Sequence, residues 1–377
     1  MDASLLLDAC LEQGISFFTG VPDSQLRGLC DTLYARYGVS GAQHVVAANE
    51  GNAIGLAAGH YLATGTPALV YMQNSGLGNI VNPMTSLMDE WVYGLPCLLV
   101  VGWRGEPGVH DEPQHIRQGA VTLDQLKLLG VQTFILDKTT DETGFRRDFS
   151  AAMAALKAGK CAAFVVRKGA LTASVKPDYS GRGTLSREEA ARHILAFTGS
   201  DPIVSTTGKL SREIFELREA RGEGHGHDFL TVGSMGHASS IAMGIALARP
   251  ERRVWCLDGD GAVLMHLGAL AVSGRKRLPN LIHIVMDNGA HETVGGMPVC
   301  EGGADWAALA RAAGYPLVLT ADTEESLDAA LAQAAGAGQL CMVIVRCAPG
   351  ARSDLGRPTT TPIQNRDAFM AELGVKA

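Results

Sequence analysis

The sequence predicts an α/β protein of two doubly wound domains, each with a parallel sheet covered by helices on both faces. Short apolar runs alternate with alanine-rich stretches of helical length along the whole chain. Strands that are apolar at consecutive positions are typical of parallel sheets, because both faces of such sheets are buried. Examples are PALVYM (67–72), PCLLVVGW (96–103), AAFVVR (162–167), RVWCL (253–257), LIHIVM (281–286) and CMVIVR (341–346).

A change of composition between residues 171 and 189 divides the chain into halves of similar size. The segment LTASVKPDYSGRGTLSREE loses the apolar pattern and gathers Pro, Gly, Ser and charged residues. Ser186 followed by Glu189 is typical of a helix N-terminus. We therefore predict an N-terminal domain over 1–172, a linker over 173–186 and a C-terminal domain over 187–377.

Composition and charge argue against several classes of protein. The 377 residues are 46% hydrophobic and 19% charged, which suits a well-buried globular chain rather than a disordered one. The formal net charge of -7 argues against nucleic acid or an anionic membrane as the main partner. No apolar run reaches the roughly 18 residues of a membrane span, and the N-terminus lacks a signal-peptide pattern. Eight scattered cysteines include no CxxC pair, so we expect a cytoplasmic protein without a zinc cage or disulfide framework.

Two carboxylates, each followed by glycine, interrupt the apolar stretch VWCLDGDGAVLM (254–265). GDG (259–261) follows one predicted strand, and the next strand ends in DNG (287–289). Ligands of parallel sheets bind beyond the carboxyl ends of strands, where the side chains of Asp260 and Asn288 would offer oxygen atoms to Mg²⁺ on a diphosphate. The glycines would let N–H groups reach phosphate oxygens. For GDG alone, a surface turn is an equally good explanation.

The spacing of these two segments resembles the cofactor signature of thiamine-diphosphate-dependent enzymes, which is GDG followed after some 25 residues by Asn-Asn. Here 26 residues separate GDG from Asn288, and Asp287 stands in the place of the first Asn. The resemblance implies that Mg²⁺ is held by Asp260, Asn288 and the carbonyl oxygen of Ala290. It also implies that thiamine diphosphate contacts a set drawn from both halves: Asn74, Gly208, Ser234, Met235, Gly236, His237, Gly259, Asp260, Gly261, Ala262, Asn288 and Ala290.

Met235 matches the bulky apolar residue that bends the cofactor in this family. An ordinary core methionine explains the same residue equally well.

A single acidic residue heads an apolar helix in the first half. Glu50 begins EGNAIGLAAG and is the only charged residue between Arg36 and Asp89. A helix N-terminal charge stabilised by the helix dipole, by about 0.3–1 kcal/mol, is the structural explanation. In the family, a glutamate at this place hydrogen-bonds the aminopyrimidine ring and promotes loss of the thiazolium proton. The resemblance therefore implies a catalytic role for Glu50.

Three loops of the first half carry polar residues beyond strand ends. They lie in FFTGVPDSQLRGL (17–29), YMQNSGLGN (71–79) and GWRGEPGVHDEPQHIRQG (102–119). Ionisable residues in such loops are favoured places for chemistry, although a solvated, proline-pinned loop explains the third equally well.

These loops, together with GSMGHASS (233–240) and DNGAHETVGG (287–296), resemble the phosphonopyruvate decarboxylases, a branch of the thiamine-diphosphate family without a middle domain. The resemblance covers nearly the whole chain. It implies non-oxidative decarboxylation of 3-phosphonopyruvate to phosphonoacetaldehyde and CO₂ in phosphonate and antibiotic biosynthesis. Besides Glu50, the expected catalytic residues are Asp23, Ser24, His110 and His115. The candidate cations for the phosphonate are Arg27, Arg104 and Lys209.

The resemblance also implies at least a homodimer, since in the family each cofactor lies between the first domain of one chain and the second of its partner. Small-residue helices after Glu50 and after Gly236 would permit close approach of another backbone.

Four alternatives remain open from the sequence. Sulfopyruvate decarboxylase acts on a sulfonate analogue by the same chemistry, and a carboligase of the family would join two keto acids. A nicotinamide dehydrogenase is disfavoured because GLGN (76–79) lacks a third glycine and no acid ends the next strand. A non-enzymatic subunit is disfavoured because Glu50, Asp260 and Asn288 are intact.

Overall fold

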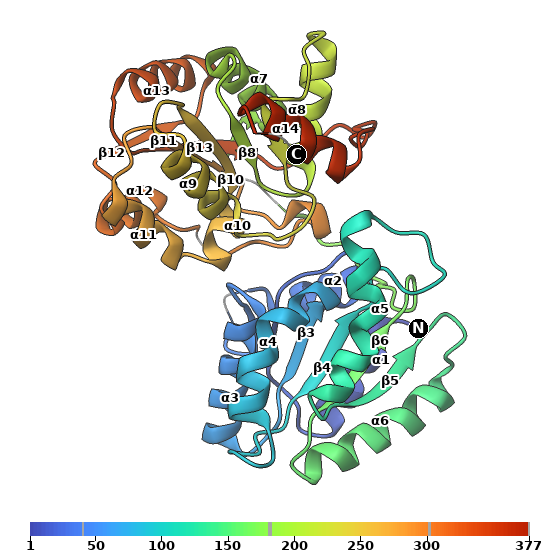
Figure 1. Cartoon of the computed structure of the whole chain (residues 1–377). Coiled ribbons are helices and arrows are strands. Elements are labelled where there is room, and N and C mark those ends of the chain that lie inside the picture. Colours follow the sequence, from blue (N-terminus) through green and yellow to red (C-terminus); the bar gives the residue numbers. More distant parts are fainter. Residues whose placement is uncertain (40, 180–182, 301–302, 376–377) are drawn as a thin grey trace. The chain divides into compact units, whose positions relative to one another are not determined.

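The chain forms two compact units in the computed structural model, which describes residues 1–39, 41–179, 183–300 and 303–375 (Figure 1). The first unit comprises Met1–Tyr179 together with Val294–Glu301, and the second comprises Ser180–Thr293 and Gly302–Ala377. A short segment from the second half of the sequence therefore packs with the first unit. No helix within the described ranges is long and apolar enough to cross a membrane.

The first unit is built on a six-stranded sheet whose strands are all parallel, in the order β2-β1-β3-β4-β6-β5. Its strands are β1 (Phe18–Gly20), β2 (His44–Val46), β3 (Leu69–Gln73), β4 (Leu98–Gly102), β5 (Gln132–Leu136) and β6 (Ala162–Val166). Its helices are α1 (Ala3–Glu12), α2 (Arg27–Tyr37), α3 (Glu50–Thr64), α4 (Leu77–Pro83), α5 (Pro113–Leu128) and α6 (Glu142–Lys157), with a 3₁₀ turn η1 (Asn74–Gly76) and a π turn η2 (Met84–Met88).

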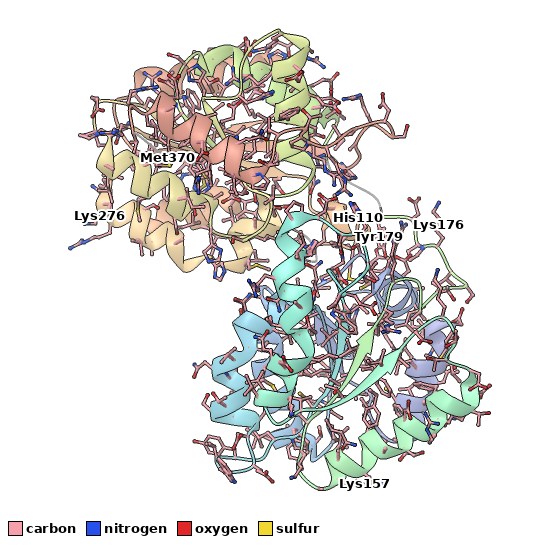
Figure 2. The ribbon with its side chains drawn as sticks, turned by 45° about the vertical axis from the view of Figure 1, so that its right-hand side comes forward. His110, Lys157, Lys176, Tyr179, Lys276 and Met370 are labelled. Carbon is pink, nitrogen blue, oxygen red and sulfur yellow. The ribbon has the colours of Figure 1, made fainter. Side chains whose placement is uncertain are left out.

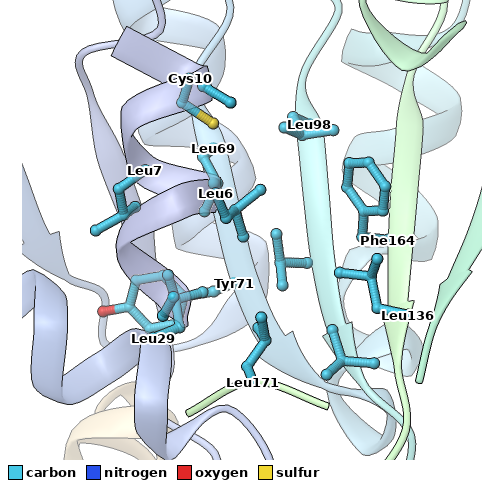
Figure 3. Close-up of a cluster of buried hydrophobic side chains, with 14 of the residues drawn as sticks. Leu6, Leu7, Cys10, Leu29, Leu69, Tyr71, Leu98, Leu136, Phe164 and Leu171 are labelled. Carbon is cyan, nitrogen blue, oxygen red and sulfur yellow. The ribbon is translucent and has the colours of Figure 1, made fainter. Parts of the chain in front are cut away.

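Two apolar layers cover the faces of this sheet. Leu69 and Tyr71 of β3 point into one layer, with α1, α2 and α6 (Figure 3). Val70 and Met72 of the same strand point into the other layer, with α3, α4 and α5. Side chains alternate across a strand, so a strand that is apolar at every position is buried on both faces. Each large apolar side chain buried in this way contributes about 1.5–3 kcal/mol.

The second unit has the same plan. Its sheet is parallel, in the order β12-β13-β11-β10-β8-β9, and β7 pairs with β13. The strands are β7 (Leu185–Ser186), β8 (Ile203–Ser205), β9 (Asp228–Leu230), β10 (Val254–Gly259), β11 (Leu281–Asp287), β12 (Leu317–Ala321) and β13 (Cys341–Ala348). The helices are α7 (Arg187–Thr198), α8 (Lys209–Ala220), α9 (Ala238–Ala248), α10 (Asp260–Met265), α11 (Gly268–Lys276), α12 (Trp306–Ala313), α13 (Glu324–Gly336) and α14 (Pro362–Glu372), with a 3₁₀ turn η3 (Glu292–Val294).

Layers again cover both faces: α7, α8 and α13 pack on one side, and α9, α11 and α12 on the other. The predicted fold class, two parallel-sheet α/β domains, is confirmed. The predicted helix start is confirmed as well, because Ser186 and Glu189 form a complete capping box at the beginning of α7.

In each sheet the strand order reverses beside a pair of three-residue strands. In the first unit the reversal lies between β1 and β3, and in the second between β8 and β10. Connections leave these strands in opposite directions, which opens a crevice at their carboxyl ends where ligands of such folds bind. The loops after β1 and β3, and those after β8 and β10, are therefore the places to look for chemistry.

Candidate active site

Glu50 is a buried carboxyl group at the start of α3. Asn49 caps the helix by accepting a hydrogen bond from the N–H of Asn52 at 2.9 Å, which sets the first helical residue beside the loop after β3. Glu50 is 5% exposed, and Asn79 of α4 donates from Nδ2 to its Oε2 at 2.7 Å. Burial raises the pKa of Glu50, while the hydrogen bond from Asn79 opposes the rise. The result is a carboxyl group that binds a proton more readily than a solvated one.

Gly76 forms the surface against which this carboxyl group packs. A Cβ atom built on Gly76 would lie 2.5 Å from Cδ of Glu50, closer than real Cβ contacts allow. Gly76 of the QNSGLGN loop therefore leaves the space that the carboxyl group of Glu50 occupies.

Asp23 lies at the reversal point between β1 and β3. It is fully buried, and its Oδ1 accepts a hydrogen bond from Nε2 of Gln73 at 2.5 Å, while Oδ2 accepts one from the N–H of Gln25 at 3.1 Å. Gly102, at the end of β4, is again the only residue that fits, since a Cβ there would lie 2.0 Å from Oδ2 of Asp23. Burial raises the pKa of Asp23 and favours its protonated form.

Arg104 and Asp111 form a bidentate ion pair in the loop between β4 and α5. Nε and Nη2 of Arg104 donate to the two oxygens of Asp111 at 2.8 and 2.5 Å, and Nη1 donates to Oγ of Ser24 at 3.1 Å. Burial opposes ionisation of Asp111, but the hydrogen bonds from Arg104 and the N–H of Gly105 outweigh it and lower its pKa to about 2. The pair brings Ser24 and Arg104 together and sets the direction of the guanidinium group.

The two histidines of this loop differ in environment. His115, in the first turn of α5, is buried, and burial together with the charge of Arg104 lowers its pKa to about 4, so it is neutral near pH 7. His110 is exposed on the segment that precedes α5 (Figure 2).

Asn74 is fully buried and ties two loops together. Its Nδ2 donates to the carbonyl of Arg104 at 2.8 Å and to Oγ1 of Thr122 at 2.9 Å, and its Oδ1 accepts from the N–H of Arg104 at 3.2 Å. These contacts hold the Arg104 loop over η1. The cofactor contact expected at Asn74 stays a prediction.

Arg27 is the most exposed of the three candidate cations. Its side chain is 52% exposed and makes a 3.4 Å contact with Asp31 one turn along α2. Lys209, at the start of α8, instead donates to Oε1 of Glu292 at 2.9 Å. Arg104 thus lies with Ser24 in the first unit, and Lys209 pairs with Glu292 within the second unit.

In the second unit, Asp260 begins α10 directly after β10, as a strand-to-helix turn rather than a hairpin. Its two oxygens accept hydrogen bonds from the N–H groups of Gly261 and Gly289, each at 2.7 Å. Burial raises the pKa of Asp260 to about 7, and the nearby Asp287 carboxylate adds to the rise. Two neighbouring carboxylates at a buried strand end are stabilised by a cation, so these residues fit a Mg²⁺ ion.

Asn288 lies beside this carboxyl group, at the end of β11. Its Oδ1 accepts from the N–H of Ala290 at 3.0 Å, and its Nδ2 donates to Oε2 of Glu292 at 2.8 Å. The carboxylate, the carboxamide and the backbone of Ala290 thus come from the ends of two adjacent strands, as the sequence indicates.

The loop GSMGHA between β9 and α9 has an unusual backbone. Ser234 has φ +54° and Gly236 has φ +87°, and Gly208, before α8, has φ +97°. A non-glycine residue in the left-handed region is uncommon and is typical of functional loops. Met235 is partly exposed rather than buried in the core, and His237 is exposed. Gly259 and Ala262 lie at the start of α10.

The other acid of the Asp-Gly-Asp-Gly sequence has a different environment. Asp258 is fully buried against His283 of β11, with 3.6 Å between Oδ2 and Nε2. Asp258 is still part of β10 and lies on the same face as Val254 and Cys256, which belong to a core layer. Asp260 lies beyond the strand, in the first turn of α10, where the alternation no longer applies.

Sequence reasoning missed three polar residues of these clusters: Gln73, Asn79 and Glu292. Asp111 stands out in the sequence only as one of the ionisable residues of the third loop, without a stated role. The signal was present, since each stands inside a motif that the resemblance uses. Their contacts connect segments remote in sequence, such as Gln73 with Asp23, and one sequence does not reveal such pairs.

Comparison with known proteins gives two matching family models. Residues 3–128 match the N-terminal TPP binding domain of thiamine pyrophosphate enzymes, and residues 206–345 match the C-terminal TPP binding domain of the same enzymes.

Three curated relatives cover most of the chain. A phosphonopyruvate decarboxylase of Streptomyces viridochromogenes is 34% identical over 95% of this chain and 91% of its own length. A phosphonopyruvate decarboxylase of Streptomyces hygroscopicus is 32% identical over 96% and 91%. A sulfopyruvate decarboxylase of Methanosarcina acetivorans is 27% identical over 78% of both chains. The chain belongs to the phosphonopyruvate decarboxylase family of thiamine pyrophosphate enzymes.

Proposed function

We propose that the protein decarboxylates 3-phosphonopyruvate to phosphonoacetaldehyde and CO₂ without oxidation, using thiamine diphosphate and Mg²⁺. The observation that carries the proposal is the similarity of this chain to two phosphonopyruvate decarboxylases, which are 34% and 32% identical to it over 95% and 96% of its length. Sulfopyruvate decarboxylase is the alternative substrate class, but that relative is 27% identical over a smaller share of the chain.

The residues at the end of β10 and β11 would hold the metal and the diphosphate. Asp260, Asn288 and the carbonyl of Ala290 would bind Mg²⁺, and the glycine turns at 208, 236 and 259–261 would present N–H groups to phosphate oxygens. Thiamine diphosphate, when bound, supplies the carbon nucleophile and the electron sink that decarboxylation needs.

Proton handling would fall to the buried acids and the neutral histidine of the first unit. Glu50 would hold a proton on its carboxyl group, because burial raises its pKa, and donate it to the aminopyrimidine ring. Asp23, also buried with a raised pKa, is suited to deliver a proton to the product carbon before release. His115 is neutral near pH 7 and is suited to exchange that proton with solvent, and the exposed His110 would stand nearer the solvent.

Recognition of the phosphonate would rest on Arg104 and Ser24, with Arg27 as a second cation. Arg104 is already oriented by Asp111, so part of its charge is neutralised while Nη1 stays directed toward Ser24. We expect R104A to raise the KM for phosphonopyruvate at least tenfold, as loss of a charge-assisted contact implies, while thiamine diphosphate affinity changes little. Steady-state kinetics at saturating cofactor test this, and an unchanged KM would remove Arg104 from the substrate site.

The decisive experiment offers the purified protein three substrates separately: phosphonopyruvate, sulfopyruvate and pyruvate, each with thiamine diphosphate and Mg²⁺. CO₂ and the aldehyde product are measured for each. The proposal requires the highest kcat/KM with phosphonopyruvate and no CO₂ without cofactor. Preference for sulfopyruvate would identify the protein as a sulfopyruvate decarboxylase. A product that joins two keto acids, instead of an aldehyde, would indicate a carboligase.

We also propose at least a homodimer, a role in phosphonate natural-product biosynthesis and a cytoplasmic location. The exposed face of α3 supports a close protein contact, since Gly55 and Gly59 have open space around them and Leu56 and Leu62 are exposed. The free thiols of Cys10, Cys30, Cys97, Cys161, Cys256, Cys341 and Cys347 suit a reducing compartment. Analytical ultracentrifugation and cell fractionation test the assembly and the location, and a strictly monomeric active protein would contradict the first.

A further inference from the structure

We propose that Glu292 is a positioning residue for the metal site: it orients the amide of Asn288 so that its oxygen is the atom presented to Mg²⁺. The inference rests on the proposed function only in assuming that Asn288 binds Mg²⁺. It concerns a residue four positions beyond that ligand, in the first turn of η3.

Glu292 accepts hydrogen bonds from three side chains that come from three different segments. Its Oε2 accepts from Nδ2 of Asn288 at 2.8 Å and from Nη1 of Arg187, and its Oε1 accepts from Nζ of Lys209 at 2.9 Å. Its side chain is 10% exposed, and that of Arg187 is 7% exposed. The carboxylate is therefore held from both oxygens, at the meeting point of α7, α8 and the loop after β11.

The chemistry of the two groups decides the orientation of the amide. A carboxylate is only an acceptor, whereas an asparagine amide has a donor end and an acceptor end of nearly equal size. Asn288 can meet Glu292 only through its NH₂ group, so its Oδ1 must point the other way. There Oδ1 accepts from the N–H of Ala290, whose carbonyl is the third expected metal ligand. With Glu292 absent, the N–H of Ala290 would be the remaining one of these two contacts that distinguishes the ends of the amide, so its orientation would be less firmly fixed.

Neighbouring charged side chains hold the carboxylate of Glu292 in one position. Arg187 also donates from Nε and Nη2 to the two oxygens of Glu213, at 2.7 and 2.6 Å. The cluster thus pairs two cations, Arg187 and Lys209, with two anions, Glu213 and Glu292. A buried carboxylate with such partners is costly to disturb, which suits the support of a ligand rather than its direct contact with the metal.

The test compares metal affinity in four proteins: wild type, E292A, N288D and the double variant N288D/E292A. Thiamine diphosphate is kept saturating, and Mg²⁺ is titrated by isothermal calorimetry, so the readout does not depend on turnover. We expect E292A to weaken Mg²⁺ binding about 10–100-fold, as loss of a group that orients a ligand does. When E292A is added to N288D, Mg²⁺ affinity should fall by less than about threefold relative to N288D alone. The reason is that a carboxylate presents an oxygen to the metal in either orientation.

A general structural role predicts a different pattern, namely the same loss of affinity in both backgrounds, and that result would overturn the proposal. K209M is the control for charge, since it removes one cation from Glu292 without touching Asn288. Mg²⁺ affinity in K209M should stay within about threefold of wild type, whereas a loss equal to that of E292A would mean that charge balance, not orientation, is responsible.

Folding and the proposed function are checked by separate measurements. Circular dichroism and thermal unfolding of the metal-free proteins establish that each variant folds. If E292A does not fold, E292Q carries the same comparison, because a carboxamide can donate as well as accept and no longer selects one orientation. A wild-type protein that binds no thiamine diphosphate with Mg²⁺ would contradict the proposed function. A wild type that binds both, with E292A binding Mg²⁺ equally well, would contradict the positioning role alone.

Discussion

Glu50 illustrates how a single residue acquires chemistry from its surroundings. Burial raises its pKa, and Asn79 fixes one of its oxygens. We expect E50Q, which keeps the size and a hydrogen bond with Asn79, to lower kcat by about 10²–10⁴-fold, because the amide cannot transfer a proton. Thiamine diphosphate affinity, measured by calorimetry, should change less than about tenfold. Activity of E50Q within tenfold of wild type would contradict a proton-transfer role.

His115 makes the stability of the protein depend on pH. Its pKa is about 4 in the folded protein, because of burial and the charge of Arg104, against 6.5 ordinarily. Between these values the unfolded chain binds a proton that the folded one does not, so the free energy of unfolding falls as pH falls. From about pH 7 to pH 4.5, the wild type should lose about 1–3 kcal/mol more than H115Q. Urea unfolding at both pH values measures this, and equal losses would contradict it.

At the scale of elements, the turn after β3 should tolerate substitution at one glycine and not at the next. In G76A the new methyl group would meet the Glu50 carboxyl group, whereas a Cβ at Gly78, in the first turn of α4, has nothing within 4 Å. We expect G76A to lose most of the activity by displacing Glu50. G78A should keep it and gain about 0.4–1 kcal/mol of stability, since alanine restricts the unfolded chain. Kinetics and thermal unfolding of both proteins decide this, and equal activities would contradict the steric reading.

Central and edge strands differ in how well the sequence predicts them. The six apolar runs correspond to β3, β4, β6, β10, β11 and β13, which lie inside the two sheets. The edge strands β5 and β12 were not predicted, because most of their residues are partly exposed and lack a continuous apolar pattern. The three-residue strands β2, β8 and β9 are too short to show a period, even though β8 is a buried central strand. A longer strand that is buried on both faces has a continuous apolar sequence that can be recognised, whereas an exposed edge strand does not.

At the scale of the whole molecule, the proposed dimer places Glu50 of one chain and the partner's Asp260 in one active site. E50Q and D260A should each be inactive alone. After unfolding and refolding together in equal amounts, half of the dimers would be mixed, and each mixed dimer would contain one intact site. The mixture should recover about a quarter of wild-type activity. No recovery, with mixed dimers present by native mass spectrometry, would mean that one chain supplies both residues.

The residues of the candidate site show where sequence reasoning ends. Asp260, Asn288 and Glu50 were found because each is a polar residue at the boundary of an apolar element and within a motif of the family, which are local patterns. That Gln73 contacts Asp23, that Asp111 orients Arg104 and that Glu292 holds Asn288 followed only from the folded chain. The Asp258–His283 pair is a similar case, because its two residues meet only when β10 and β11 pair side by side.

The sequence by itself determined the fold class, the helix start at Ser186, the family and the two polar strand ends, because hydrophobic periodicity, capping and motif spacing are properties of neighbouring residues. The tertiary structure decided the contacts between loops, the shifted pKa values of the buried acids and the partners of the three candidate cations. These features depend on how deeply each side chain is buried and on which residues distant in sequence come into contact. Burial and contacts are both established only when the helices pack on the two sheets.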